Sequence, residues 1–122
     1  MSAKSLAALW VEMQAFMQSG SPDAQWLADL LASTSTSFIR DGLEGTDAVV
    51  INKAGWISED GGYYSEDSDE AIAYESVTDA GLISVDGQVY LMAIVTNQPD
   101  GDTSEQDVRD LARALFDARS ML

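Results

Sequence analysis

The chain has 122 residues, 21 acidic and 6 basic side chains, no histidine, no cysteine, and a formal charge of −15. This length suits one domain, because compact domains typically contain about 100–200 residues, and 46% hydrophobic residues allow a buried core. The missing residue types exclude disulfides, thiol nucleophiles, imidazole bases and zinc sites built from thiolate or imidazole. The negative charge disfavours nucleic acid and anionic lipid surfaces as partners, since association would begin with repulsion.

Two helices are predicted in the first third of the chain. Apolar side chains recur at the three-and-four spacing of one helix face within residues 6–17. Ser21 suits an N-cap and Pro22 suits the first helical position, so a second helix should begin there, with an apolar stripe over residues 26–31. Residues 33–37 are all Ser or Thr, which compete for backbone hydrogen bonds, and the second helix should therefore weaken near them.

The middle of the chain is predicted to form strands. Residues 48–51 are a short β-rich run, and two longer runs cover residues 80–85 and 88–96. Between these two runs stands an Asp-Gly pair, which is typical of a tight hairpin because glycine tolerates the positive φ of a primed turn.

A last helix is predicted from the apolar stripe over residues 108–116. Its start offers a capping box, formed either by Thr103 with Gln106 or by Asp102 with Glu105. The order of elements predicts an α+β fold, with a small antiparallel sheet of about three strands and with the N-terminal helices and the C-terminal helix packed on it. We expect residues 1–122 to form a single domain.

The most informative polar site is Lys53-Ala54-Gly55, at the end of the first apolar strand. The ammonium of Lys53 could hold a carboxylate in an otherwise negative protein, and Gly55 would let backbone approach closely. The alternative is a lysine at a strand end that extends into solvent. These residues taken alone favour the alternative.

The order of elements, with Lys53-Ala54-Gly55 and then Asp79-Ala80-Gly81-Leu82-Ile83, resembles the C-terminal part of class A-like serine beta-lactamases and related penicillin-recognising serine hydrolases. Lys53-Ala54-Gly55 stands where that family has a Lys-Thr-Gly motif beside the active site. The resemblance implies that Lys53 holds the substrate carboxylate and that the Trp56 amide is an oxyanion donor. It also implies an extracellular or cell-envelope location. Ala54 departs from the usual Thr and removes a hydroxyl contact to substrate. The substrate-binding residues implied are Lys53, Ala54, Gly55 and Trp56.

The family's nucleophile lies in a Ser-x-x-Lys motif, and this sequence has none, because Met1 and Val50 stand three residues before the two lysines. The first hypothesis is therefore the C-terminal portion of a larger serine hydrolase for β-lactams or peptidoglycan-type amides, with its nucleophile on other polypeptide. The alternative is a non-catalytic binding or interaction module that retains this half of the fold. We expect the isolated chain to be inactive.

No cofactor and no metal site are predicted. The acidic segment 59–70 contains oxygen ligands that suit Ca²⁺, but an EF-hand starting at Asp67 would place Ile72 where glycine is required, so a solvated loop is favoured. No stretch approaches the ~20 apolar residues of a membrane span.

The resembled fold pairs the strand Val89–Val95 with strands absent here. Its free edge should bind the missing N-terminal part of the parent protein or a second copy, or be covered by the chain's own helix.

Overall fold

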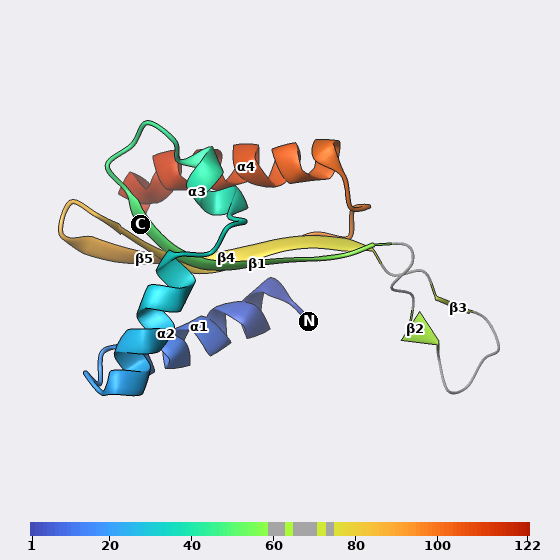
Figure 1. The fold of residues 1–122 in the computed structure, drawn as a ribbon. Coiled ribbons are helices and arrows are strands. Elements are labelled where there is room, and N and C mark those ends of the chain that lie inside the picture. Colours follow the sequence, from blue (N-terminus) through green and yellow to red (C-terminus); the bar gives the residue numbers. More distant parts are fainter. Residues whose placement is uncertain (59–62, 65–70, 73–74) are drawn as a thin grey trace.

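The computed structural model describes residues 1–58, 63–64, 71–72 and 75–122, and it has three layers (Figure 1). The middle layer is an antiparallel sheet with strand order β1-β4-β5, and helices cover both of its faces. Helices α1 and α2 lie on one face, and α3 and α4 lie on the other (Figure 1). The elements of these layers are α1 (Ala3–Met17), α2 (Pro22–Ala32), α3 (Phe38–Gly42), β1 (Val49–Ile57), β4 (Ser76–Val85), β5 (Gln88–Val95) and α4 (Asp102–Asp117).

Three short elements complete the chain. Strands β2 (Tyr63–Tyr64) and β3 (Ala71–Ile72) pair with each other as an antiparallel ribbon, and a 3₁₀ turn, η2 (Ala118–Met121), follows α4. The predicted acidic loop, residues 59–70, lies outside the described residues apart from β2. None of the helices in the described ranges is long and apolar enough to cross a membrane.

Helix α2 begins where local side-chain chemistry predicts. Ser21 caps α2 by accepting a hydrogen bond from the Ala24 amide at 3.1 Å, and Pro22 occupies the first turn. Helix α2 ends at Ala32, directly before the run of Ser and Thr. Both the start and the end of the second predicted helix are therefore confirmed.

Two details of the other helices differ from the prediction. Helix α3 was not predicted; Ser37 caps it by accepting from the Arg40 amide at 3.0 Å. The predicted capping box of α4 is wrong, because Gly101 occupies the N-cap position and no side chain caps the helix. Gly101 has a φ of 154°, a conformation that glycine tolerates, and the residues proposed as caps consequently lie inside the helix.

The predicted hairpin is confirmed. Strands β4 and β5 are antiparallel and are joined by Asp86 and Gly87, whose φ angles are 53° and 73°. Positive φ at both positions is the geometry of the primed turns that match strand twist. The three β-segments lie side by side in one sheet, which confirms the α+β prediction.

Two hydrophobic clusters fill the spaces between the layers. Successive side chains of a strand point to opposite faces, so β1 contributes Val50 and Ala54 to the cluster beneath α3 and α4, and Ile51 to the cluster above α1 and α2. By the same alternation Asn52 faces the α3 side, and Lys53 faces the α1 and α2 side. The second cluster is built around Trp10, Leu31, Ala80 and Leu82.

Candidate functional site

Lys53 lies near the middle of β1, an edge strand of the sheet, and it is exposed. The prediction that it stands at a strand end is wrong, because β1 continues to Ile57. Its ammonium donates a hydrogen bond to the carbonyl oxygen of Ala54. Two hollows share this side chain in their walls, one of about 700 Å³ and one of about 240 Å³. Lys53 therefore reaches solvent and borders concave surface at the same time.

The larger hollow is a cleft between α1 and the ends of β1 and β4. Its walls are mainly apolar, and Lys53 is the one charged side chain among the described residues that line it. The apolar lining comes chiefly from Leu6, Leu9, Trp10, Met13, Leu31, Trp56 and Ile57.

The smaller hollow is polar. Three consecutive hydroxyl-bearing residues, Thr34, Ser35 and Thr36, line it together with Lys53 and Trp56. An ammonium and several hydroxyl donors around one concavity suit an anion such as a carboxylate, because hydrogen bonds to ionised groups are stronger than neutral ones. From sequence, these hydroxyl residues were expected only to weaken the end of a helix.

The two small residues of the predicted motif contribute mainly backbone to the site. Ala54 has a buried side chain that packs in the cluster beneath α3 and α4. A Cβ added at Gly55 would meet only the Thr78 hydroxyl, at 3.4 Å, so none of the described residues makes the close approach expected there. Trp56 pairs with Val77 across the strands, and its side chain is 50% exposed.

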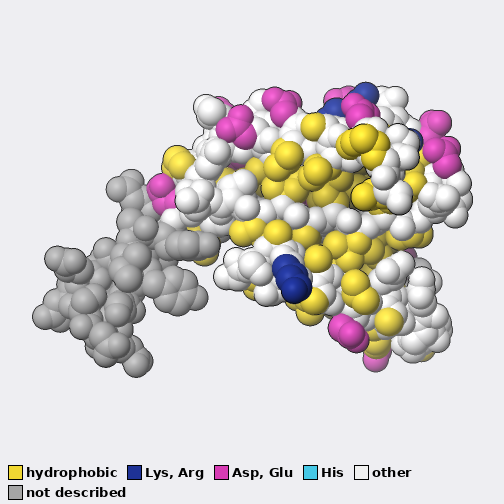
Figure 2. All heavy atoms as spheres, turned by 180° about the vertical axis from the view of Figure 1, so that it is seen from behind, with side chains coloured by type: hydrophobic (Ala, Val, Ile, Leu, Met, Phe, Trp, Pro, Cys, Tyr) yellow, Lys and Arg dark blue, Asp and Glu magenta, His cyan; other side chains and the backbone are white. Residues whose placement is uncertain are grey.

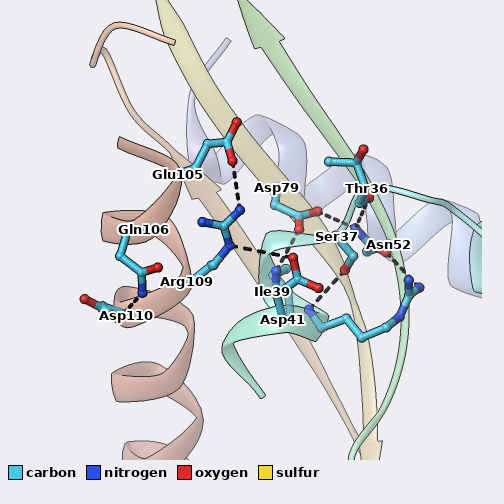
Figure 3. Close-up of polar contacts among 11 residues, drawn as sticks. Thr36, Ser37, Ile39, Asp41, Asn52, Asp79, Glu105, Gln106, Arg109 and Asp110 are labelled. Carbon is cyan, nitrogen blue, oxygen red and sulfur yellow. Dashed lines mark hydrogen bonds and ion pairs between the residues drawn. The ribbon is translucent and has the colours of Figure 1, made fainter. Parts of the chain in front are cut away.

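Behind this edge lies a buried carboxylate to which the sequence analysis gave no role. Asp79 on β4 is fully buried, and its two oxygens accept hydrogen bonds from the Asn52 side-chain amide at 2.8 Å and from the Ile39 backbone amide at 2.9 Å (Figure 3). Burial raises the pKa of Asp79, and the hydrogen bonds from Asn52 and from the backbone oppose this shift. The burial of Asp79 and Asn52 could have been inferred from the sequence, since both polar residues stand at inward-facing positions of apolar strands.

Arg40 extends this network to the surface. Its guanidinium donates to the carbonyl oxygen of Thr34 at 2.9 Å, to that of Val50 at 3.3 Å, and to the side-chain oxygen of Asn52 at 3.2 Å. The Thr34 hydroxyl also donates to the Asn52 oxygen, at 2.9 Å. The wall of the smaller hollow is thus connected to the interior of the sheet.

A second set of charges joins the helices on that face. Arg109 on α4 forms ion pairs with Glu105 at 2.8 Å and with Asp41 of α3 at 3.6 Å (Figure 3), and its guanidinium lies 5.4 Å from the centre of the Phe38 ring. These contacts fix α3 against α4. Within the part of the chain that the structure describes, no group of three or more acidic side chains could hold a metal ion.

Comparison of this chain with known proteins identifies the family to which it belongs. A family model described as the beta-lactamase enzyme family matches residues 1–118. The chain belongs to the beta-lactamase enzyme family. This confirms the predicted resemblance. The chain is also similar to a solved structure of PBP-A, with a TM-score of 0.68 and 25% sequence identity over 98% of this chain.

The match to PBP-A covers 40% of that protein's chain. None of the curated proteins matches this sequence significantly. In this member of the beta-lactamase family, the four predicted site residues are consecutive on β1, from Lys53 to Trp56. All four line the larger cleft, and all except Gly55 also border the hydroxyl-lined hollow.

Proposed function

We propose that this chain is the C-terminal portion of a serine beta-lactamase-like hydrolase of β-lactams or peptidoglycan-type amides, in which Lys53 holds the substrate carboxylate. The observation that carries the proposal is the position of this ammonium, which borders both hollows in a chain of net charge −15. The family match and the similarity to PBP-A support the class of reaction.

Lys53 and Trp56 on β1 have separate roles in this proposal. The carboxylate accepts hydrogen bonds from the Lys53 ammonium and from the hydroxyls of Ser35 and Thr36, because the Thr34 hydroxyl already donates to Asn52. The amide of Trp56 stabilises the negative charge that develops on the reacting carbonyl, a contribution worth about 10²–10³ in rate for one such donor. A serine on other polypeptide attacks that carbonyl and forms an ester, while the amide C–N bond breaks and the serine proton passes to the leaving nitrogen. Water then cleaves the ester, which releases the carboxylic acid and regenerates the serine.

Removal of the ammonium tests the proposal. In a ¹⁵N NMR titration with benzylpenicillin, we expect shifts of the amides at residues 53–56 and 34–36. Lys53→Ala should weaken binding by tenfold or more, since a hydrogen bond to a charged group contributes about 1.5–3 kcal/mol. Lys4→Ala, which removes the other lysine from an exposed position on α1, is the matched control and should bind as the wild type does.

Two results would contradict this proposal. Equal binding by Lys53→Ala and Lys4→Ala would remove Lys53 from the site. Turnover of nitrocefin by the wild-type chain alone would show that a nucleophile other than the motif serine operates in this sequence.

Ala54 supports a second candidate, a non-catalytic binding module, because the family's Lys-Thr-Gly motif has a hydroxyl at that position. The natural protein, purified from its source and treated with a fluorescent penicillin, separates the two functions. A covalent adduct that survives denaturation supports the hydrolase. Reversible binding without an adduct supports the module.

We further propose that the free edge of β5 pairs with a strand outside this chain. Within the described residues β5 pairs with β4 alone, and residues 89–95 carry no charged side chain that would block pairing. Figure 2 shows hydrophobic side chains gathered at the level of the sheet, beneath the acidic surface of α4. A groove of about 370 Å³ runs between β5 and the end of α4, with Tyr90, Met92 and Phe116 in its walls. Because the chain spans 40% of PBP-A, the natural partner proposed is the remaining polypeptide of a longer protein.

Without that polypeptide, a second copy should occupy the edge. At about 0.15 M salt, where charges are screened beyond about 8 Å, light scattering of the wild-type chain should give the mass of a dimer. Val89→Lys should give a monomer, because a charge on an edge strand opposes pairing. Val49→Lys is the control, since Val49 is similarly exposed, 63% against 51%, but lies on the opposite edge strand. A wild-type monomer would refute this arrangement.

A further inference from the structure

Residues 34–36, which form one wall of the smaller hollow, cannot be fixed in place by apolar packing. Residues 34–36 connect α2 to α3 and consist only of Thr and Ser. Hydroxyl side chains bury little apolar surface, so hydrogen bonds must fix such a segment in one conformation. The bonds that reach it from the rest of the molecule therefore determine where its hydroxyls lie.

Those bonds come from Asn52 and Arg40. The Thr34 hydroxyl donates to the side-chain oxygen of Asn52 at 2.9 Å, and the Thr34 carbonyl oxygen accepts from Arg40 at 2.9 Å. At the other end of the segment, the Asn52 side-chain nitrogen donates to the carbonyl oxygen of Thr36 at 3.5 Å. One buried amide thus contacts both ends of the segment.

Asp79, on the other side of Asn52 from the segment, sets the orientation of that amide. Both Asp79 oxygens accept hydrogen bonds, one from the Asn52 nitrogen at 2.8 Å and the other from the Ile39 amide, so the carboxyl group acts as an acceptor toward Asn52. The nitrogen of the Asn52 side chain must therefore point toward Asp79, which turns the oxygen toward Thr34 and Arg40. Asp79 is held in turn by the Ile39 amide at 2.9 Å, in the first turn of α3.

We propose that Asn52, oriented by Asp79, is a positioning residue that holds the hydroxyl segment 34–36 against the Lys53 hollow. Neither Asn52 nor Asp79 lines that hollow, and both are fully buried, so their effect on a ligand is indirect. The statement that the hollow binds a carboxylate rests on the proposed function. The statement that this buried pair orders the segment does not.

Two variants test the positioning role. Thr34→Val keeps the shape of the side chain and removes the hydroxyl that bonds to Asn52, whereas Asn52→Ala removes the whole connection. Ser33→Ala is the matched control, because the neighbouring Ser33 hydroxyl bonds only locally, to the Leu30 carbonyl oxygen at 3.1 Å. The readouts are ¹⁵N backbone order parameters of residues 35 and 36 and the dissociation constant for benzylpenicillin.

Order parameters near 0.85 are expected in the wild type and in Ser33→Ala, and values toward 0.6 in Thr34→Val and Asn52→Ala. Benzylpenicillin affinity should fall about tenfold in both connecting variants, in line with the loss of about one buried hydrogen bond. Unchanged order parameters in a folded variant overturn the positioning role, whatever the affinity does. Should Asn52→Ala fail to fold, the order parameters of residues 35 and 36 in Thr34→Val decide whether the positioning role holds. Absence of benzylpenicillin binding by the wild-type chain overturns the proposed function instead, and the order parameters still test the positioning.

Discussion

Gly81→Ala is expected to lower the free energy of unfolding by about 3 kcal/mol, the upper range for forcing extra volume into a packed interior. A Cβ at this position would overlap the carbonyl oxygen of Ile51 and approach the Cβ of Asn52 to 2.9 Å. Both belong to β1, directly across from β4. The strands would have to separate where Asn52 bonds Asp79, and a loss of 3 kcal/mol is a large part of the total stability of a typical domain, about 5–15 kcal/mol.

Gly55→Ala provides a control within the same pair of strands. Its added Cβ would meet only the Thr78 hydroxyl at 3.4 Å, an ordinary contact, so the midpoint of urea unfolding should stay within a few tenths molar of the wild type. If both variants unfold at the same urea concentration, the close approach of β1 to Gly81 has no special energetic weight, and the register described here would need revision.

The features that sequence predicted correctly depend on neighbours in the chain. Ser21 with Pro22 determines the start of α2, and the positive φ angles of Asp86 and Gly87 determine the hairpin. Such chemistry acts over two or three residues, so the sequence displays it directly. The strand that carries Lys53 was also predictable, because an apolar β-rich run leads into it, but the strand continues past Lys53 to Ile57.

The features that sequence missed depend on distant partners. Asp79 accepts a hydrogen bond from an amide 40 positions away and another from a side chain 27 positions away, and no local pattern encodes either contact. The α4 cap failed for a different reason: several residues near Gly101 could start a helix, and only the path of the chain after β5 selects one of them. The hydroxyl wall of the hollow was missed because residues 34–36 gain their role only when β1 lies beside them.

Asn52→Asp should have the largest electrostatic effect, because it places a second carboxylate beside Asp79. The pKa of Asp79 is already raised above its ordinary value of 3.8, chiefly by burial. A raised pKa in the folded state means that this group's contribution to stability is fully present below the ordinary pKa and is lost as pH rises through the folded pKa. In Asn52→Asp the amide donor is replaced by an acceptor at a site where the two side chains lie 2.8 Å apart, so the pair must share a proton or repel.

At pH 7 the variant should lose about 3 kcal/mol of stability, as expected when a buried charge has no adequate partner, and the loss should shrink as pH falls toward 5. Arg40, 3.2 Å from the side-chain oxygen of Asn52, offsets only part of the repulsion because it approaches from the side away from Asp79. It also bonds three backbone carbonyl oxygens, those of Ala32, Thr34 and Val50. Gln98→Glu makes the same amide-to-carboxylate change at an exposed site and should leave the pH dependence of unfolding unchanged. An Asn52→Asp variant with wild-type stability at pH 7 would mean that Arg40 pairs with the new carboxylate while Asp79 stays protonated, and the amide orientation inferred for Asn52 would then lose its cause.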